Sequence, residues 1–245
     1  GSSDSIAGAN TALNAIVAEA FCEAADLLER SGSFEHDAKT LVARYMIDHS
    51  RILFHGNGYA GEWVREAARR GLPNFPSMVD AIPALMTEKS VRLFEKFGIF
   101  TRAELASRAE VMYETYAKTV NIEAQTMAHM AAKHYIPAVI HYITRLAHSV
   151  NAVRDASAYA DVSVQEELLV QCSERLAAAR KALKELEALT ARTNAMEDVQ
   201  AMACAFHEQV VPAMAALRAP IDELELLVDK DMWPVPTYGD LMFEV

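Results

Sequence analysis

Apolar residues recur in steps of three and four along most of this chain, which is the spacing of amphipathic α-helices. A first helix is predicted for residues 10–30 and a second for 34–54. Shorter helices at 61–70 and 87–97 run into Gly71 and Gly98, and glycine is the residue that most often closes a helix. Residues 72–83 contain Pro73, Pro76 and Pro83, so that stretch is predicted to be irregular.

The longest helical pattern begins at Thr101, which forms a capping-box signature with Glu104. It continues to about residue 153, and Pro137 is predicted to kink it. Ser163 and Glu166 form a second capping-box signature. We therefore expect a second long helix to begin at Ser163.

Two heptad-like seams follow along the last third of the chain. Their members are Leu169, Cys172, Leu176, Ala179, Leu183 and Leu186, then Val199, Ala203, Phe206, Val210, Ala213 and Leu217. Thr193 and Asn194 lie between the seams, so the two helices are predicted to pair as an antiparallel hairpin. The fold class is therefore all-α, a bundle of long antiparallel helices with a kinked long helix and an extended C-terminal tail.

Composition narrows the functional classes. The chain has 245 residues and a net charge of −11, and a field of that sign disfavours nucleic-acid binding. No apolar run is long enough for a membrane span. The three cysteines form no paired motif, which is typical of a reduced, cytoplasmic setting.

A search for catalytic chemistry finds no complete site. His134, His141 and His148 are spaced by seven on one helix, too far apart to share one metal ion, and are interpreted as polar-face or interface residues. His207 and Glu208 begin a zinc-protease pattern that Val211 does not complete. The predicted catalytic, cofactor-binding and metal-binding sets are therefore empty.

Two other features of the sequence each have two interpretations. Residues 56–58 (Gly-Asn-Gly) are able to cradle a phosphate, but without a P-loop lysine or a preceding strand a turn is the preferred interpretation. Trp63 and Trp233 are predicted to anchor irregular segments to the core, or to serve as subunit-interface anchors, and Tyr238 is a further candidate interface anchor.

Six segments of the chain resemble the C-terminal region of type III glutamine synthetases. They are GSSDSIAGANTALNAIVAE (1–19), LFHGNGYAGEWVREAARRGLPN (53–74), DAIPAL (80–85), EKSVRLFEKFGIFTRAELASR (88–108), YAKTVNIEAQTMAHMA (116–131) and VDKDMWPVPTYGDLMFEV (228–245). The resemblance covers essentially the whole chain. Ala9, Ala109 and Gln125 depart from the family pattern, which suggests a divergent member.

The resemblance implies that residues 1–31 are the last helix of a truncated catalytic domain and that residues 32–245 are the C-terminal helical domain. The family joins ammonia to glutamate with ATP and divalent Mg or Mn, in oligomers whose active sites neighbouring subunits share. Its metal, nucleotide and glutamate ligands lie upstream of the segment that matches Gly1. The resemblance therefore implies no cofactor in this chain, with ATP and Mg or Mn held by the full-length parent.

Three hypotheses follow. The first is a structural or oligomer-assembly part of the synthetase, without ATP hydrolysis or γ-glutamyl transfer of its own, partnered by the catalytic domain and neighbouring subunits in a homo-oligomer. The second is a free-standing helical interaction module, and the third a metal-dependent helical-bundle enzyme. The first predicts that Leu13, Ile16, Val17 and Phe21 are either unusually exposed or turned onto the bundle.

Overall fold

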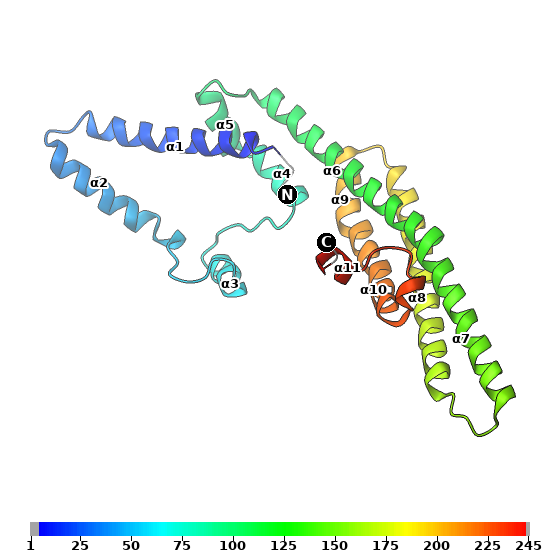
Figure 1. Cartoon of the computed structure of the whole chain (residues 1–245). Helices are drawn as coiled ribbons and strands as arrows, with labels where there is room; N and C mark the ends of the chain where they lie inside the picture. The colour runs from blue at the N-terminus through cyan, green and yellow to red at the C-terminus, as the bar shows by residue number, and fades with distance from the viewer. Residues whose placement is uncertain (1–4, 244–245) are drawn as a thin grey trace. The chain divides into compact units, whose positions relative to one another are not determined.

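The computed structural model describes residues 5–243, except the side chain of Tyr238, and all the regular elements in that range are helices. The chain divides into two compact units, residues 1–109 and 110–245. Figure 1 shows the helices in chain order. The all-α prediction is confirmed. Within the described range, no helix combines the length and the apolar character needed to cross a bilayer.

The first unit is built from short and medium helices. They are α1 (Ala7–Leu28), α2 (Phe34–Asp48), the 3₁₀ turn η1 (Ser50–Ile52), α3 (Gly61–Arg69), α4 (Met78–Leu85), α5 (Glu88–Lys96) and the start of α6 (Arg102–Met130). Its core is a small cluster around Ala15, Val91, Phe94 and Leu105. An ion pair between Lys96 and Glu19, 2.5 Å apart, ties α5 to α1 beside that cluster.

Helix α1 packs through its small residues and not through its large ones. Ala15 is 2% exposed and Ala12 packs against the same cluster, whereas Phe21 is 70% exposed. The apolar stripe that marks this helix in the sequence therefore faces away from the core of its own unit.

Local signals explain several helix ends in this unit. Gly71 and Gly98 have φ of +69° and +62°, and the N–H that follows each donates back across the last turn, as in a Schellman cap. Thr101 and Glu104 form the predicted reciprocal box: the Thr101 N–H donates to the Glu104 carboxylate at 2.8 Å, and the Glu104 N–H to the Thr101 hydroxyl at 3.3 Å.

Two sequence-based boundaries and one predicted capping box are wrong, although the second long helix begins at Ser163 as predicted. Helix α2 ends at Asp48, and the 3₁₀ turn η1 takes up part of the predicted remainder. The predicted irregular stretch contains α4, because the Ser77 hydroxyl caps the N–H of Asp80 at 3.1 Å and the helix tolerates Pro83. Ser163 forms no capping box: its N–H donates to Asp161 at 2.9 Å.

The second unit is a bundle of long helices. It contains α6 from Glu110, α7 (Ile136–Ala156), α8 (Ser163–Asn194), α9 (Val199–Ala205), α10 (Val211–Leu227), the 3₁₀ turn η4 (Lys230–Met232) and α11 (Tyr238–Phe243). Helix α8 packs against both α7 and α10, which confirms the predicted antiparallel hairpin. Most members of the two seams are buried: Cys172, Ala179, Leu183, Leu186, Ala203, Phe206, Val210 and Leu217 are at most 1% exposed. Leu169, Leu176 and Val199 are only half-buried.

Two π-helical turns interrupt the long helices, and each ends two residues before a proline. They are η2 (Ala131–Tyr135), before Pro137, and η3 (Phe206–Val210), before Pro212. The N–H of Ile136 donates to Ala131, and the N–H of Val211 to Phe206, both five residues back. Since proline has no N–H and its ring crowds the preceding turn, the wider turn relieves both problems. The interruption predicted at Pro137 therefore takes the form of a π turn.

Candidate binding surfaces

Trp63 holds the segment after α2 against α3. Its ring centroid lies 4.6 Å from that of Phe54, and the Arg70 guanidinium lies 5.8 Å from the ring. Arg70 also donates to the carbonyl oxygens of Arg51 at 3.1 Å and Leu53 at 2.7 Å. Trp63 thus pins an irregular segment within its own unit, and its use as a subunit anchor stays a prediction.

Glu66 completes this cluster. Hydrogen bonds from Arg69 and Arg70 lower the pKa of the Glu66 carboxyl to about 2, and the Arg70 contact is 2.5 Å long. Because the Glu66 carboxylate and the two backbone carbonyls all accept from Arg70, that side chain is held in one orientation over the Trp63 ring.

Residues 56–58 lie in the turn between η1 and α3. Neither glycine has a positive φ, so the turn lacks the left-handed residue typical of a phosphate-binding nest. A Cβ added at Gly56 would come within 2.6 Å of the Phe54 ring. The glycine therefore serves the close approach of that ring, which favours the turn interpretation over the phosphate cradle.

Trp233 fastens the C-terminal tail to the second unit. It is 7% exposed, and its ring stacks on Tyr135 with centroids 5.1 Å apart. Past it, Asp240 accepts from Lys230 at 2.5 Å and from the Thr237 N–H at 2.8 Å. The side chain of Tyr238 lies outside the described part of the chain. Trp233 therefore fixes the tail within this chain, and the interface role of both aromatics stays a prediction.

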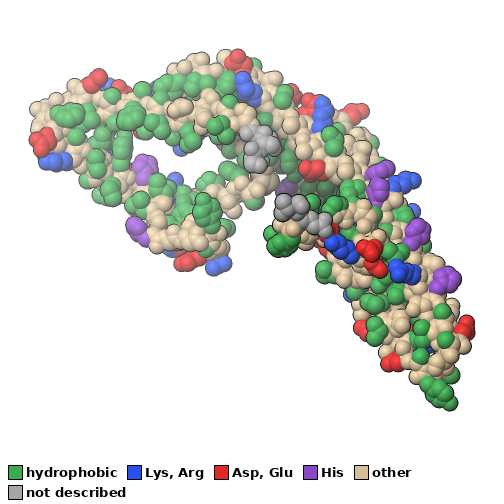
Figure 2. Space-filling view, in the orientation of Figure 1, with side chains coloured by type: hydrophobic (Ala, Val, Ile, Leu, Met, Phe, Trp, Pro, Cys, Tyr) green, Lys and Arg blue, Asp and Glu red, His purple; other side chains and the backbone are tan. Residues whose placement is uncertain are grey.

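The histidines of the long helix remain apart. His134, His141 and His148 are exposed along η2 and α7, where Figure 2 shows histidines at the edge of the helix. The π turn brings His134 beside His129, with ring centroids 5.9 Å apart. Among the described residues no three His, Cys, Asp or Glu side chains gather as a metal-ligand set.

A cavity of about 620 Å³ lies between α6, η2, α10 and the tail. Ala131, Leu217, Ile221 and Trp233 form its buried walls. Burial raises the pKa of Tyr135, and the negative charges of Glu225 and Asp222 add to that rise. This cavity could not be predicted from the sequence, because its walls come from three segments that are spread along the chain from Ile122 to Leu241.

The exposed apolar face of α1 is the second surface of note. Leu13 is 60% exposed, Ile16 54%, Val17 50% and Phe21 70%, which confirms the exposed alternative predicted for this helix. Helix α2 adds exposed residues that sequence reasoning did not single out, namely Phe34, Val42, Met46 and Ile47. Figure 2 shows hydrophobic side chains gathered along both helices. A monomeric protein rarely exposes contiguous apolar area of this kind.

Comparison with known proteins agrees with the resemblance that the sequence shows. A family model described as the glutamine synthetase C-terminal domain matches residues 37–154. A type-3 glutamine synthetase of Dictyostelium discoideum is 31% identical over 238 residues, which cover 94% of this chain and 32% of that protein.

Two bacterial relatives agree. A glutamine synthetase of Bacteroides fragilis is 31% identical over 251 residues, covering 99% of this chain and 34% of that protein. One of Butyrivibrio fibrisolvens is 32% identical over 207 residues, covering 84% of this chain and 30% of that protein. The chain thus spans about a third of the length of the curated relatives it matches.

Proposed function

The chain belongs to the glutamine synthetase family, and from this we propose that it is the C-terminal helical region of a type III synthetase, with a structural and assembly role. In this proposal the parent protein ligates ammonia to glutamate in the cytoplasm with ATP and Mg or Mn. The catalytic domain of the parent holds those groups, and no residue of this chain is assigned to them.

The observation that carries the proposal is the exposed apolar face of α1. This helix uses alanines for its own unit and turns Ile16 and Phe21 outward. Burying such side chains stabilises an interface by about 25 cal/mol per Å² of apolar area. The relatives are about three times as long as this chain, so the partner we propose for the α1 face is the catalytic domain, with neighbouring subunits of a homo-oligomer beside it.

An association experiment tests this role. Without a covering partner, the chain of residues 1–245 is expected to bind a hydrophobic dye and to self-associate, with an average mass that rises with concentration in light scattering. Ile16→Asp places a charge in the α1 face and is expected to reduce both signals. Ile140→Asp is the matched control, since Ile140 is 47% exposed on α7.

Two outcomes would contradict the proposal. One is a wild-type chain that stays a monodisperse monomer at high concentration without binding the dye. The other is equal loss of association in Ile16→Asp and Ile140→Asp, since the association would then not depend on α1.

The free-standing interaction module remains the alternative function, because an exposed apolar face also suits a separate partner. The coding DNA upstream of Gly1 separates the two. An in-frame continuation that encodes a β-rich catalytic domain supports the assembly role. A ribosome-binding site and start codon at that point support the module.

A further inference from the structure

The cavity between α6, α10 and the tail has the size and walls of a small-molecule site. Its volume of about 620 Å³ falls within the roughly 300–1,000 Å³ of typical ligand pockets. Met127, Met130 and Met214 line it together with the stacked rings of Tyr135 and Trp233. Methionine side chains adapt to ligand shape, and aromatic faces attract cations.

The charged groups that line the cavity are mainly negative. Asp222 pairs with Arg218 at 3.0 Å. Glu123 and Glu225 also line the cavity, and neither has an ion pair or side-chain hydrogen bond within residues 5–243. Glu225 is half-buried, so water screens its charge less than that of a fully exposed carboxylate. The four charged side chains together leave two unbalanced negative charges beside an apolar, aromatic wall.

We propose that this cavity binds a small organic cation, an amine or quaternary ammonium carried on an aromatic or branched aliphatic body. The apolar body lies among the methionines and Leu217, and the ammonium lies within reach of Glu225 and the aromatic faces. Burial raises the pKa of Tyr135, and Glu225 and Asp222 add to that rise, which places the negative charge of Glu225 close to the aromatic wall.

A basic peptide of a partner protein would match the same charge, but the geometry favours a small ligand. The tail of this chain, through Trp233, Val235 and Pro236, forms one wall of the cavity, and Asp240 fastens that tail to Lys230 at 2.5 Å. An extended peptide would need a continuous groove, whereas this wall closes one side.

Two tryptophans, one in each unit, give a direct readout. The chain of residues 1–245 labelled with ¹⁵N shows one indole N–H signal for Trp63 and one for Trp233, assigned with Trp63→Phe. Phenethylamine is expected to shift the Trp233 signal in a saturable way and to leave Trp63 unchanged. Its neutral counterpart 2-phenylethanol is expected to bind about fivefold more weakly, and phenylacetate more weakly still.

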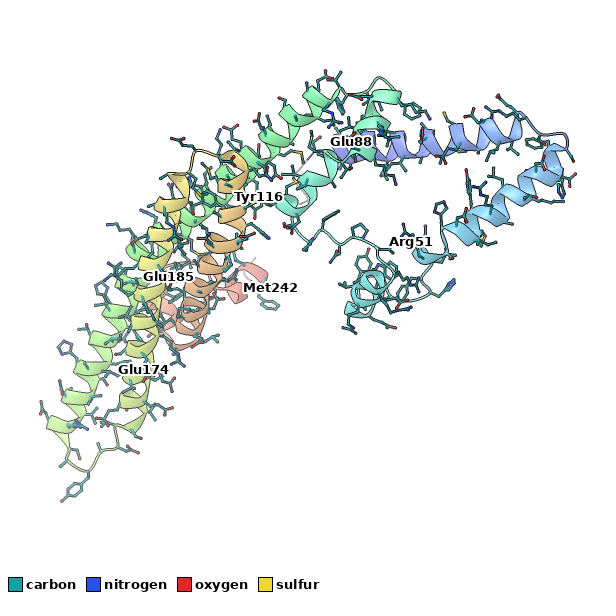
Figure 3. All side chains as sticks on the ribbon, turned by 180° about the vertical axis from the view of Figure 1, so that it is seen from behind. Arg51, Glu88, Tyr116, Glu174, Glu185 and Met242 are labelled. Atoms are coloured by element: carbon teal, nitrogen blue, oxygen red, sulfur yellow. The ribbon has the colours of Figure 1, made fainter. Side chains whose placement is uncertain are left out.

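A matched pair of variants isolates the charge. Glu225→Gln is expected to weaken the binding of phenethylamine about fivefold and to leave the affinity for 2-phenylethanol unchanged. Glu185→Gln removes the same charge from an exposed position on α8 outside the cavity (Figure 3) and is expected to change neither.

The outcomes that overturn the proposal are distinct. Equal affinity for the amine, the alcohol and the carboxylate would leave an apolar cavity without cation preference. Binding of a lysine-rich peptide at Trp233, with no response to phenethylamine, would assign the surface to a protein partner. If Glu225→Gln and Glu185→Gln weaken phenethylamine binding equally, the preference for the amine comes from the net charge of the chain and not from Glu225.

Discussion

Single carboxylates fasten the irregular segments of this protein, and Asp240 is the one that fastens the tail. The hydrogen bond from Lys230, followed by those from Thr237, lowers the pKa of the Asp240 carboxyl from 3.8 to about 2. A pKa below its unfolded value means that the charged carboxylate stabilises the folded tail. That contribution is complete above about pH 4 and is lost as the pH falls toward 2.

We therefore expect the environment of Trp233 to change in acid. In Trp63→Phe, where Trp233 is the remaining tryptophan, the fluorescence should shift toward that of an exposed indole between about pH 4 and pH 2. Adding Asp240→Asn should remove this step and give the altered signal already at neutral pH. If the two profiles coincide, Asp240 does not hold the tail.

At the residue scale, the sequence predicts helix ends correctly where the capping residues are neighbours along the chain. Gly71 and Gly98 close helices, and Thr101 forms its box with Glu104, because these signals are local. Ser163 forms no box for two reasons: its N–H donates to Asp161, and Glu166, its expected partner, pairs with Arg154 on α7.

Among the elements, the π turns carry the clearest prediction. In η2 the N–H of Ile136 reaches back five residues to Ala131, so the turn holds one residue more than an α-helix needs. Deleting the exposed Lys133 should therefore restore an α-helical turn and keep Val139, Leu146 and Val150 on the buried face of α7. Because the deletion also places Pro137 in a regular α-helical turn, which costs about 3 kcal/mol, we expect the melting temperature to fall by about 6 °C, measured by circular dichroism.

Deletion of His141 is the matched control, because His141 is also exposed but lies in a regular part of α7. Removing it rotates the residues that follow by about 100° relative to those before, which takes Leu146 and Val150 off the core. A loss of 10 °C or more is expected. Equal melting temperatures for the two deletions would show that η2 does not absorb a residue.

Periodicity finds helices but does not say which face a helix buries. Helix α1 buries Ala15 and exposes Phe21, because its larger apolar side chains have no counterpart within the first unit. Helix α4 was not predicted, because the prolines of this stretch favour irregular structure. The structure shows that the Ser77 hydroxyl accepts from the Asp80 N–H and caps the helix.

For the whole molecule, the hairpin of the second unit follows from its sequence, and the cavity does not. The seams of α8 and α10 repeat along each helix, so each helix carries its own pairing signal. The cavity needs Met127, Met214 and Val235 together, and only the course of the tail brings Val235 to the other two.

The two units differ in how much apolar surface they bury, and this predicts unequal protection of their backbones. Among the described side chains, the first unit (residues 5–109) buries nine apolar ones and exposes sixteen large ones. The second unit (residues 110–243, without Tyr238) buries 23 and exposes 11. Local opening is easiest where buried apolar contacts are few. Hydrogen exchange of the whole chain should therefore be fast in α1–α3 and slowest in α8 and α10.

Helix α6 provides an internal control, since it begins in the first unit and continues in the second. One helix with continuous backbone hydrogen bonds should still show protection that rises from Arg102 to Met130, because packing and not helix formation limits exchange. Uniform protection along α6, or protection of α1 equal to that of α8, would contradict this. The second result would mean that the first unit is stable without the partner we propose for its α1 face.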